Sequence, residues 1–357
     1  MNAARPGAAL DLKALLPVSP DAYPQAMDLV RGLVLVIRMD TRAYREASFL
    51  DDRILGPATE GAWMAGSAVM QAARQVLDGR PVHFIFHTGH VGSTLLSRLL
   101  DETGAVLGLR EPLPLRTLAD AQDVLGSPES LLGVAQFESL LDTLLGLWSR
   151  GYDATRAVVV KATSSTGRLA PKLLSQSPAS RAVYLNLAPE PYLATLLGGA
   201  NSGQDLRGHG PGRMRRLLAG RDLPVAPLYA LSAGELAALG WIVESLSQAT
   251  AQDAAGTRVL ALDFDSFLDD VPGHLSNVLA HLELPRDDAS IAKIAGSAVL
   301  RQYSKAPELP FPTGERAARL ATARREHGAE IAKGLAWLDK LARADAAITA
   351  VLARSTP

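Results

Sequence analysis

Short apolar runs alternate with longer segments of helical spacing through the middle of the chain. Residues dense in Val, Ile, Leu and Phe form five such runs, at 82–87, 105–109, 157–160, 182–187 and 258–264. None of these runs alternates apolar with polar residues, so both faces of each strand are expected to be covered, which is typical of parallel strands between helices. The pattern therefore predicts an α/β fold with a parallel sheet and helices on both faces.

Composition narrows the class of protein. The chain has 357 residues, 48% of them hydrophobic, and its 36 basic and 37 acidic residues leave a net charge of −1. A chain of this length can bury a large core, and a balanced charge provides no general attraction for nucleic acid or an anionic membrane. Cysteine is absent, which excludes disulfides and thiolate metal sites. Because no long uncharged apolar run or secretory pattern is present, we expect a cytoplasmic protein.

Three regions follow from the pattern. Residues 1–78 read as a helical N-terminal extension, residues 79–285 as the α/β core, and residues 286–357 as a C-terminal loop and helices packed on the core. Residues 200–214 are rich in glycine and polar residues, and we expect a mobile loop over a site there. Trp241 and Trp337 stand among Leu, Val and Ile at helical spacing and are predicted to be core residues.

The turn after the first core run carries the strongest functional signal. Residues 87–94 read HTGHVGST, in which Gly89 and Gly92 allow a sharp bend and Ser93 and Thr94 open a helix. Successive backbone N–H groups and a helix N-terminus form an anion site in a phosphate loop. The strict nucleotide-triphosphatase pattern has a lysine where this chain has Ser93. The alternative is a plain helix cap, which leaves Gly89 unexplained.

The residues around this turn resemble a known family. Residues 85–116, IFHTGHVGSTLLSRLLDETGAVLGLREPLPLR, resemble the first two motifs of the sulfotransferase superfamily, especially the bacterial members and those related to the tyrosylprotein sulfotransferases. In that superfamily a loop binds the 5′-phosphosulfate end of 3′-phosphoadenosine-5′-phosphosulfate (PAPS). Residues 258–285 resemble its late strand and helix. The resemblance covers residues 80–285 and implies a P-loop NTPase-like sulfotransferase core with PAPS as the sulfuryl donor.

The resemblance also assigns cofactor-binding positions. His90 stands where the family has a basic residue, Leu187 where an arginine grips the 3′-phosphate, and Thr195 where a serine follows it. The missing charge could come from several basic residues, of which Arg213 and Lys305 are our preferred candidates; the others are Arg207, Arg215, Arg216 and Arg301. The predicted cofactor-binding set is Gly89, His90, Val91, Gly92, Ser93, Thr94, Thr195, Arg213 and Lys305.

Catalytic candidates follow the strands at the same edge of the sheet. Glu111 follows the second run and matches the glutamate that serves as base in the tyrosylprotein-related members. It could equally form a surface ion pair with Arg110 or Arg116. Lys161 ends the third run and could be only a solvated strand end. We predict Glu111 as the base and assign stabilisation of the sulfuryl group and the leaving phosphate to His90 and Lys161.

The predicted function is transfer of a sulfuryl group from PAPS to a hydroxyl or amine on a small molecule or peptide, with no nucleic-acid or membrane partner and no metal. The alternative is an ATP- or GTP-dependent phosphotransferase (kinase) that uses magnesium on the same scaffold. Coordination of magnesium by Asp263 would favour that alternative. A third possibility is a catalytically inactive nucleotide-binding protein. The sequence leaves the acceptor and the oligomeric state open.

Overall fold

The centre of the molecule is a five-stranded parallel sheet. The computed structural model describes residues 6–199, 202–310, 312 and 314–355. The sheet has the order β5-β6-β4-β7-β8, formed by β4 (Val82–His87), β5 (Val106–Arg110), β6 (Ala157–Lys161), β7 (Ala182–Asn186) and β8 (Val259–Asp263). Every neighbouring pair is parallel. The predicted fold class is confirmed, and each strand lies within one residue of its predicted run.

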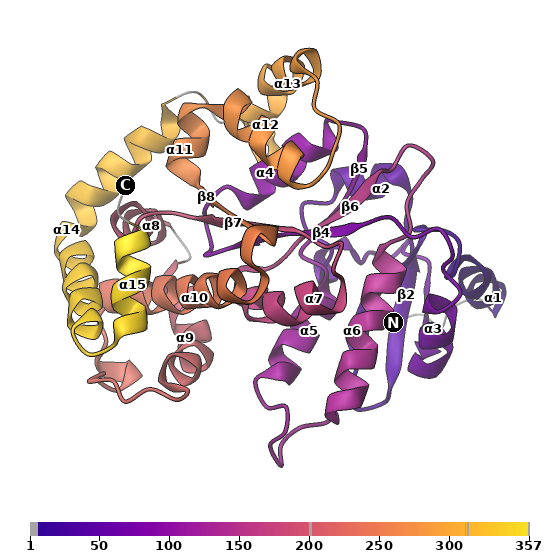
Figure 1. Cartoon of the computed structure of the whole chain (residues 1–357), viewed down its shortest axis with the longest axis horizontal. Coiled ribbons are helices and arrows are strands. Elements are labelled where there is room, and N and C mark those ends of the chain that lie inside the picture. The colour runs from indigo at the N-terminus through magenta and orange to yellow at the C-terminus, as the bar shows by residue number, and fades with distance from the viewer. Residues whose placement is uncertain (1–5, 200–201, 311, 313, 356–357) are drawn as a thin grey trace.

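Helices cover both faces of this sheet (Figure 1). Their bounds are α4 (Ser93–Asp101), α5 (Leu113–Gln122), α6 (Val134–Trp148), α7 (Ala170–Gln176), α8 (Pro189–Leu197), α9 (Ser202–Leu218), α10 (Ala233–Ala255), α11 (Phe264–Asp269) and α12 (Val271–His281). Alternate residues of β4 enter different clusters. Ile85 packs with α4 and α12, whereas Phe84 and Phe86 pack with α5, α6 and α7. Burial on both sides explains why the residues in the middle of these strands are mainly apolar.

The N-terminal region differs from the prediction. It contains α1 (Pro6–Leu15), α2 (Thr41–Glu46) and α3 (Gly66–Ala73), but also an antiparallel sheet of β1 (Ala22–Asp28), β2 (Leu33–Arg38) and β3 (Gly61–Ala65). The prediction of a helical extension over residues 1–78 therefore missed this sheet. Pro24 hid β1 in the sequence, because proline is confined to edge strands and bulges, and β1 is an edge strand with a bulge between Pro24 and Ala26.

The predicted mobile loop over residues 200–214 is also corrected. Residues 202–214 belong to α9, while residues 200 and 201 lie outside the described residues. Glycines and Pro211 disfavour a helix locally, but Leu206 and Leu217 are buried in the core cluster that includes α10. Tertiary packing therefore overrides weak helix propensity in α9.

The C-terminal region contributes to the core cluster on one face of the sheet. It comprises α13 (Asp288–Ala295), a hairpin of β9 (Gln302–Tyr303) and β10 (Ala306–Pro310), and the helices α14 (Glu315–Ala342) and α15 (Ala346–Arg354). Trp337 of α14 and Trp241 of α10 are buried in one cluster with Ile85, so their prediction as core residues is confirmed. Within the described part of the chain, no helix has the length and apolar character needed to cross a membrane.

Candidate functional site

The candidate site lies at the carboxyl end of β4, where the order of the strands reverses. The chain passes from β4 through α4 to β5 on one side, and later crosses from β6 to β7 on the other side of β4. Open α/β sheets bind their ligands at such a reversal, outside the carboxyl ends of the strands. The loop from Thr88 to Gly92, here called the anion loop, joins β4 to α4 at this position.

The anion loop has an unusual backbone. Gly89, His90 and Gly92 have φ values of 106°, 56° and 69°. Left-handed residues at a turn direct successive N–H groups toward one side, which creates a concave anion site. A Cβ atom at Gly92 would overlap the Phe264 ring, with Cδ2 at 2.6 Å and two further ring atoms closer. Only glycine fits at this position. A plain helix cap does not require glycine, so the close approach of Phe264 is not explained by the helix-cap interpretation.

Two polar groups at this turn have no partner among the described residues. The buried hydroxyls of Thr88, in the anion loop, and Thr94, in α4, make no hydrogen bond there. Ser93 is buried at the first turn of α4, and the Val91 side chain is fully buried in the core, so Val91 offers only its main chain. Buried polar groups normally have partners, so these hydroxyls are candidates to bind a ligand.

Glu111 and Lys161 form a buried ion pair at the same edge of the sheet. β5 and β6 are parallel neighbours with Arg110 opposite Lys161, so Glu111 follows directly beside the lysine. The Lys161 Nζ donates to Glu111 Oε1, and Thr163 Oγ1 donates to the other carboxylate oxygen at 3.5 Å. The side chains of Lys161 and Glu111 are only 1% and 12% exposed.

This pair removes two alternative interpretations. Glu111 does not pair with its arginine neighbours at the surface. Arg110 forms an ion pair with Asp101, and the Arg116 Nη2 atom lies 3.5 Å from Asp51 Oδ2. Lys161 is not a solvated strand end. Glu111 also has a φ of 52°, which is uncommon for a residue with a side chain and often marks a functional position.

Burial lowers the pKa of Lys161, and the cations of Lys305 and Arg110 lower it further, while Glu111 opposes the shift. A lysine whose charge is held by one carboxylate in a buried setting is a strong hydrogen-bond donor to any oxygen that gains negative charge nearby. The pair thus combines a proton acceptor and a cationic donor.

His90 is an exposed residue of the anion loop. Desolvation of its imidazole, together with the charges of Lys305 and Arg213, lowers the pKa of His90 to about 4. The imidazole is consequently neutral near pH 7, so His90 does not bring the positive charge that the family's basic residue would bring.

The six basic residues considered for the missing charge differ in exposure and in their partners. Arg207, Arg215 and Arg301 are exposed, and Arg216 forms an ion pair with the buried Glu244 at 2.8 Å. Arg213 and Lys305 are the two whose charge acts on His90.

Lys305 stands at the turn between β9 and β10. The Arg98 Nε of α4 holds that turn by donating to the Ser304 carbonyl oxygen at 2.7 Å. The hairpin therefore places a cation from the C-terminal region beside the anion loop.

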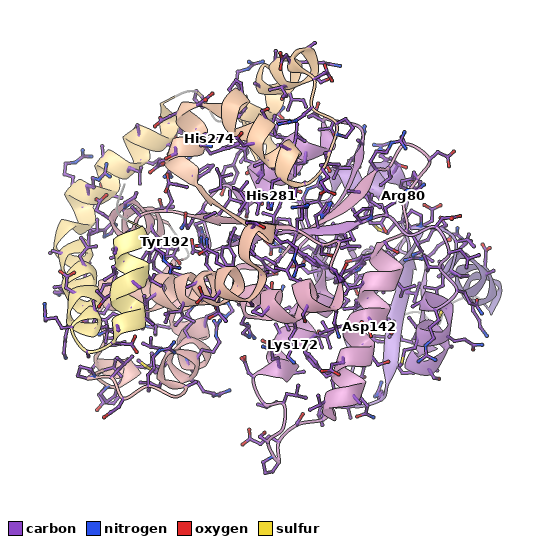
Figure 2. All side chains as sticks on the ribbon, in the orientation of Figure 1. Arg80, Asp142, Lys172, Tyr192, His274 and His281 are labelled. Atoms are coloured by element: carbon purple, nitrogen blue, oxygen red, sulfur yellow. The ribbon has the colours of Figure 1, made fainter. Side chains whose placement is uncertain are left out.

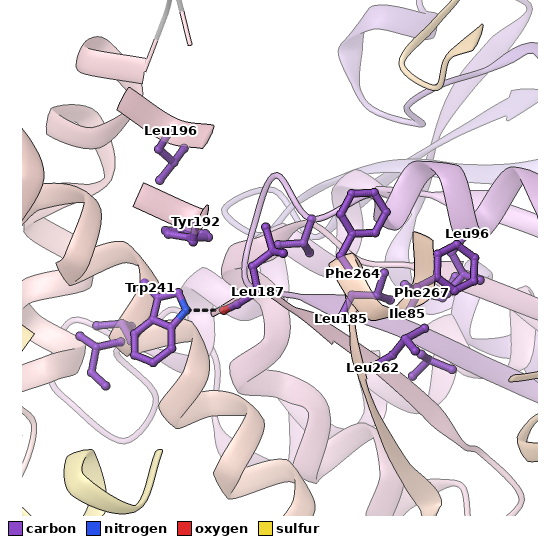
Figure 3. Packing of buried hydrophobic residues seen from close by; sticks show 14 of the residues in the cluster. Ile85, Leu96, Leu185, Leu187, Tyr192, Leu196, Trp241, Leu262, Phe264 and Phe267 are labelled. Atoms are coloured by element: carbon purple, nitrogen blue, oxygen red, sulfur yellow. Dashed lines mark hydrogen bonds between the residues drawn. The ribbon is translucent and has the colours of Figure 1, made fainter. Parts of the chain in front are cut away.

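Two family-derived positions lie apart from this cluster. The Leu187 side chain is 1% exposed among core residues, and its carbonyl oxygen accepts from Trp241 Nε1 at 2.9 Å (Figure 3). The Thr195 hydroxyl donates to the Pro191 carbonyl oxygen within α8 at 2.7 Å. Neither side chain supplies a positive charge.

Asp263 serves a structural purpose. Its carboxylate accepts from the Ser266 backbone N–H at 2.9 Å and caps α11. No group of three or more His, Cys, Asp or Glu side chains among the described residues is arranged to hold a metal ion.

The segment that precedes β3 also borders the site, although nothing in the sequence indicates it. The centroid of the Phe49 ring lies 5.8 Å from Lys161 Nζ, and the Arg53 guanidinium stacks over the same ring with its Cζ 3.4 Å from the centroid. The Leu50 N–H donates to the Arg110 carbonyl oxygen at 2.6 Å, which fixes this segment next to Glu111. No local motif signals this contact, since it joins residues distant in sequence.

Neither a protein-family model nor a curated protein matches the chain. Among solved structures, the sulfotransferase domain from the curacin biosynthetic pathway is 15% identical, with 65% of this chain and 83% of that one covered and a TM-score of 0.37. A mouse sulfotransferase complexed with PAP is 12% identical to this chain, with 79% of this chain and 92% of that one covered and a TM-score of 0.38. A sulfotransferase from Mycobacterium avium is also 12% identical, with 89% of this chain and 95% of that one covered and a TM-score of 0.37. These are members of the superfamily that the motifs resemble.

Proposed function

We propose that the chain is a sulfotransferase-like enzyme that transfers a sulfuryl group from PAPS to a hydroxyl or amine acceptor. The observation that carries this proposal is the buried Glu111–Lys161 pair at the same sheet edge as the anion loop. Transfer to a hydroxyl needs an anion site, a base and a cationic donor. All three are residues of adjoining strand ends in this chain.

The residues of the loop fit the anionic end of PAPS. The main chain of Gly89 to Gly92 and the hydroxyls of Ser93 and Thr94 would hold phosphate or sulfate oxygens, and Thr88 and Thr94 have unpartnered buried hydroxyls available for this. Lys305 would neutralise part of the charge. When bound, PAPS supplies the group to be transferred and adenosine-3′,5′-bisphosphate (PAP) remains.

Each catalytic residue has a distinct task. Glu111 accepts the proton of the acceptor hydroxyl or amine. Lys161 orients the Glu111 carboxylate through its hydrogen bond and presents its charge where negative charge develops. The neutral His90 offers one ring N–H as a donor from the loop.

The kinase alternative is less well supported. A magnesium ion needs carboxylate oxygens close to the phosphates. The strand next to β4 ends in Lys161, and the Asp263 carboxylate is used as a helix cap. The acceptor could be a small molecule or a peptide, and we place neither nucleic acid nor a membrane among the partners.

The direct test measures transfer of labelled sulfate from PAPS to a panel of phenols, alcohols and amines. The wild type should form a sulfated product, and Glu111→Gln should lower the rate by roughly 100- to 10,000-fold while PAP still binds. Transfer of phosphate from ATP with magnesium, without any sulfated product, would favour the kinase reading and overturn the proposal.

A further inference from the structure

Arg213 of α9 is a buried cation without a counterion in the described part of the protein. The residue is 8% exposed, and its Nε and Nη1 groups are buried without a hydrogen-bond partner. A buried charge is normally paired, because removing it from water is costly. Such an unpaired guanidinium is a strong sign of a ligand-binding role.

The surroundings of Arg213 lead to the anion loop. Its Nη1 and Cζ atoms and the Tyr192 hydroxyl each lie 3.4 Å from the position that a Cβ atom would take at Gly240 of α10. The same Tyr192 hydroxyl donates to the Thr88 carbonyl oxygen at 3.1 Å and lies 3.6 Å from the Cβ position of Gly89. Tyr192, labelled in Figure 2, is buried. Arg213 therefore lies near a hydroxyl that is bonded directly to the anion loop.

Arg216 offers a comparison within the same helix. It lies three residues further along α9, and its Nη2 donates to the buried Glu244 carboxylate at 2.8 Å. Among the described residues, the fold therefore provides a carboxylate for Arg216 and none for Arg213. This difference favours a bound ligand as the counterion of Arg213.

We propose that Arg213 is the cation of the anion loop: its guanidinium binds an oxyanion of the phosphate or sulfate groups held there and takes the place of the basic residue that His90 replaces. The guanidinium fork suits such oxygens, because it offers parallel N–H donors. The assignment of the ligand as PAPS rests on the proposed function, whereas the assignment of an oxyanion to Arg213 does not.

The test compares Arg213→Met with Arg216→Met in the full-length protein. Thermal unfolding is measured without ligand, with PAP and with inorganic pyrophosphate, and the dissociation constant of PAP is measured by calorimetry. Without ligand, Arg213→Met should unfold at or above the wild-type temperature, since it removes an unpaired buried charge. Its affinity for PAP should fall by roughly 10- to 100-fold, with the ligand-induced rise in unfolding temperature largely lost.

Arg216→Met should behave in the opposite way. It leaves Glu244 unpaired, so the unliganded protein should unfold at a lower temperature while its PAP affinity stays within about threefold of wild type. Arg213→Lys keeps a positive charge but loses the forked guanidinium, so it should retain part of the affinity for PAP. This variant replaces Arg213→Met in the test if the methionine variant fails to fold.

The outcomes separate this inference from the proposed function. If Arg213→Met lowers the unliganded unfolding temperature as Arg216→Met does and binds PAP like the wild type, Arg213 is structural and the inference is overturned. If the wild type binds pyrophosphate through Arg213 but not PAP, the inference holds and the PAPS proposal fails. If neither ligand binds the wild type, both are overturned.

Discussion

Replacing Gly92 with alanine should damage both the stability of the fold and the anion loop. The left-handed φ of 69° costs an alanine about 1–2 kcal/mol. The new Cβ would also overlap the Phe264 ring, which is 7% exposed and stacks with Phe267 at a centroid distance of 6.5 Å, so the ring cannot simply turn outward. Overpacking of this kind costs about 1–3 kcal/mol, which gives about 2–5 kcal/mol in total.

Gly104→Ala is the matched control. Gly104 has a φ of 70° with nothing within 4 Å of its Cβ position, so alanine there carries only the backbone cost of about 1–2 kcal/mol. Urea unfolding at equilibrium measures both free energies of unfolding. Trimming the ring in Gly92→Ala/Phe264→Leu should recover part of the loss, as a double-mutant cycle would reveal. Equal costs for Gly92→Ala and Gly104→Ala, or strictly additive effects in the double variant, would refute the overlap argument.

Three further predictions concern single groups. Asp263→Ala should lower the free energy of unfolding by about 1 kcal/mol through loss of its cap on Ser266 and leave PAP affinity unchanged, whether or not magnesium is present; a magnesium-dependent loss of nucleotide binding would contradict this. Lys161→Met should lower sulfuryl transfer by roughly 100-fold or more with PAP affinity nearly kept, as measured by single-turnover kinetics, and an unchanged rate would remove Lys161 from catalysis. In β4, burial and then the Arg181 charge lower the pKa of His83 from 6.5 to about 4. Between these pH values the folded state binds fewer protons than the unfolded state, so the free energy of unfolding should fall by up to about 3 kcal/mol as the pH drops through this range. His83→Gln should flatten this pH dependence, as measured by urea titrations at several pH values.

The core strands were predictable because most of their residues are apolar and buried. In the run 182–187 the one strongly polar residue is Asn186, so no alternation marks a solvated face, and length then separates the run from a helix. The strands of the N-terminal sheet are less regular. Pro24 sits inside β1, where a proline normally argues against a strand, and only the bulge and the edge position make it acceptable.

The site was predictable where it depends on strand ends. Glu111 and Lys161 follow neighbouring parallel strands, so topology alone brings them together. Phe49 and Arg53 could not be found, because they reach this edge through the N-terminal region. Arg213 was one basic residue among several in a segment that reads as a loop, and only helical packing in α9 buries it and separates it from Arg216.

Whether the anion loop binds a sulfuryl donor can be decided by calorimetric titration of the wild-type protein with PAP, and separately with ATP plus magnesium. We expect PAP to bind without magnesium, with a dissociation constant in the micromolar range, which corresponds to a binding free energy of about −8 kcal/mol. ATP with magnesium should bind at least about tenfold more weakly. Binding of ATP only in the presence of magnesium, with no heat from PAP, would contradict the assignment of this loop to a sulfuryl donor.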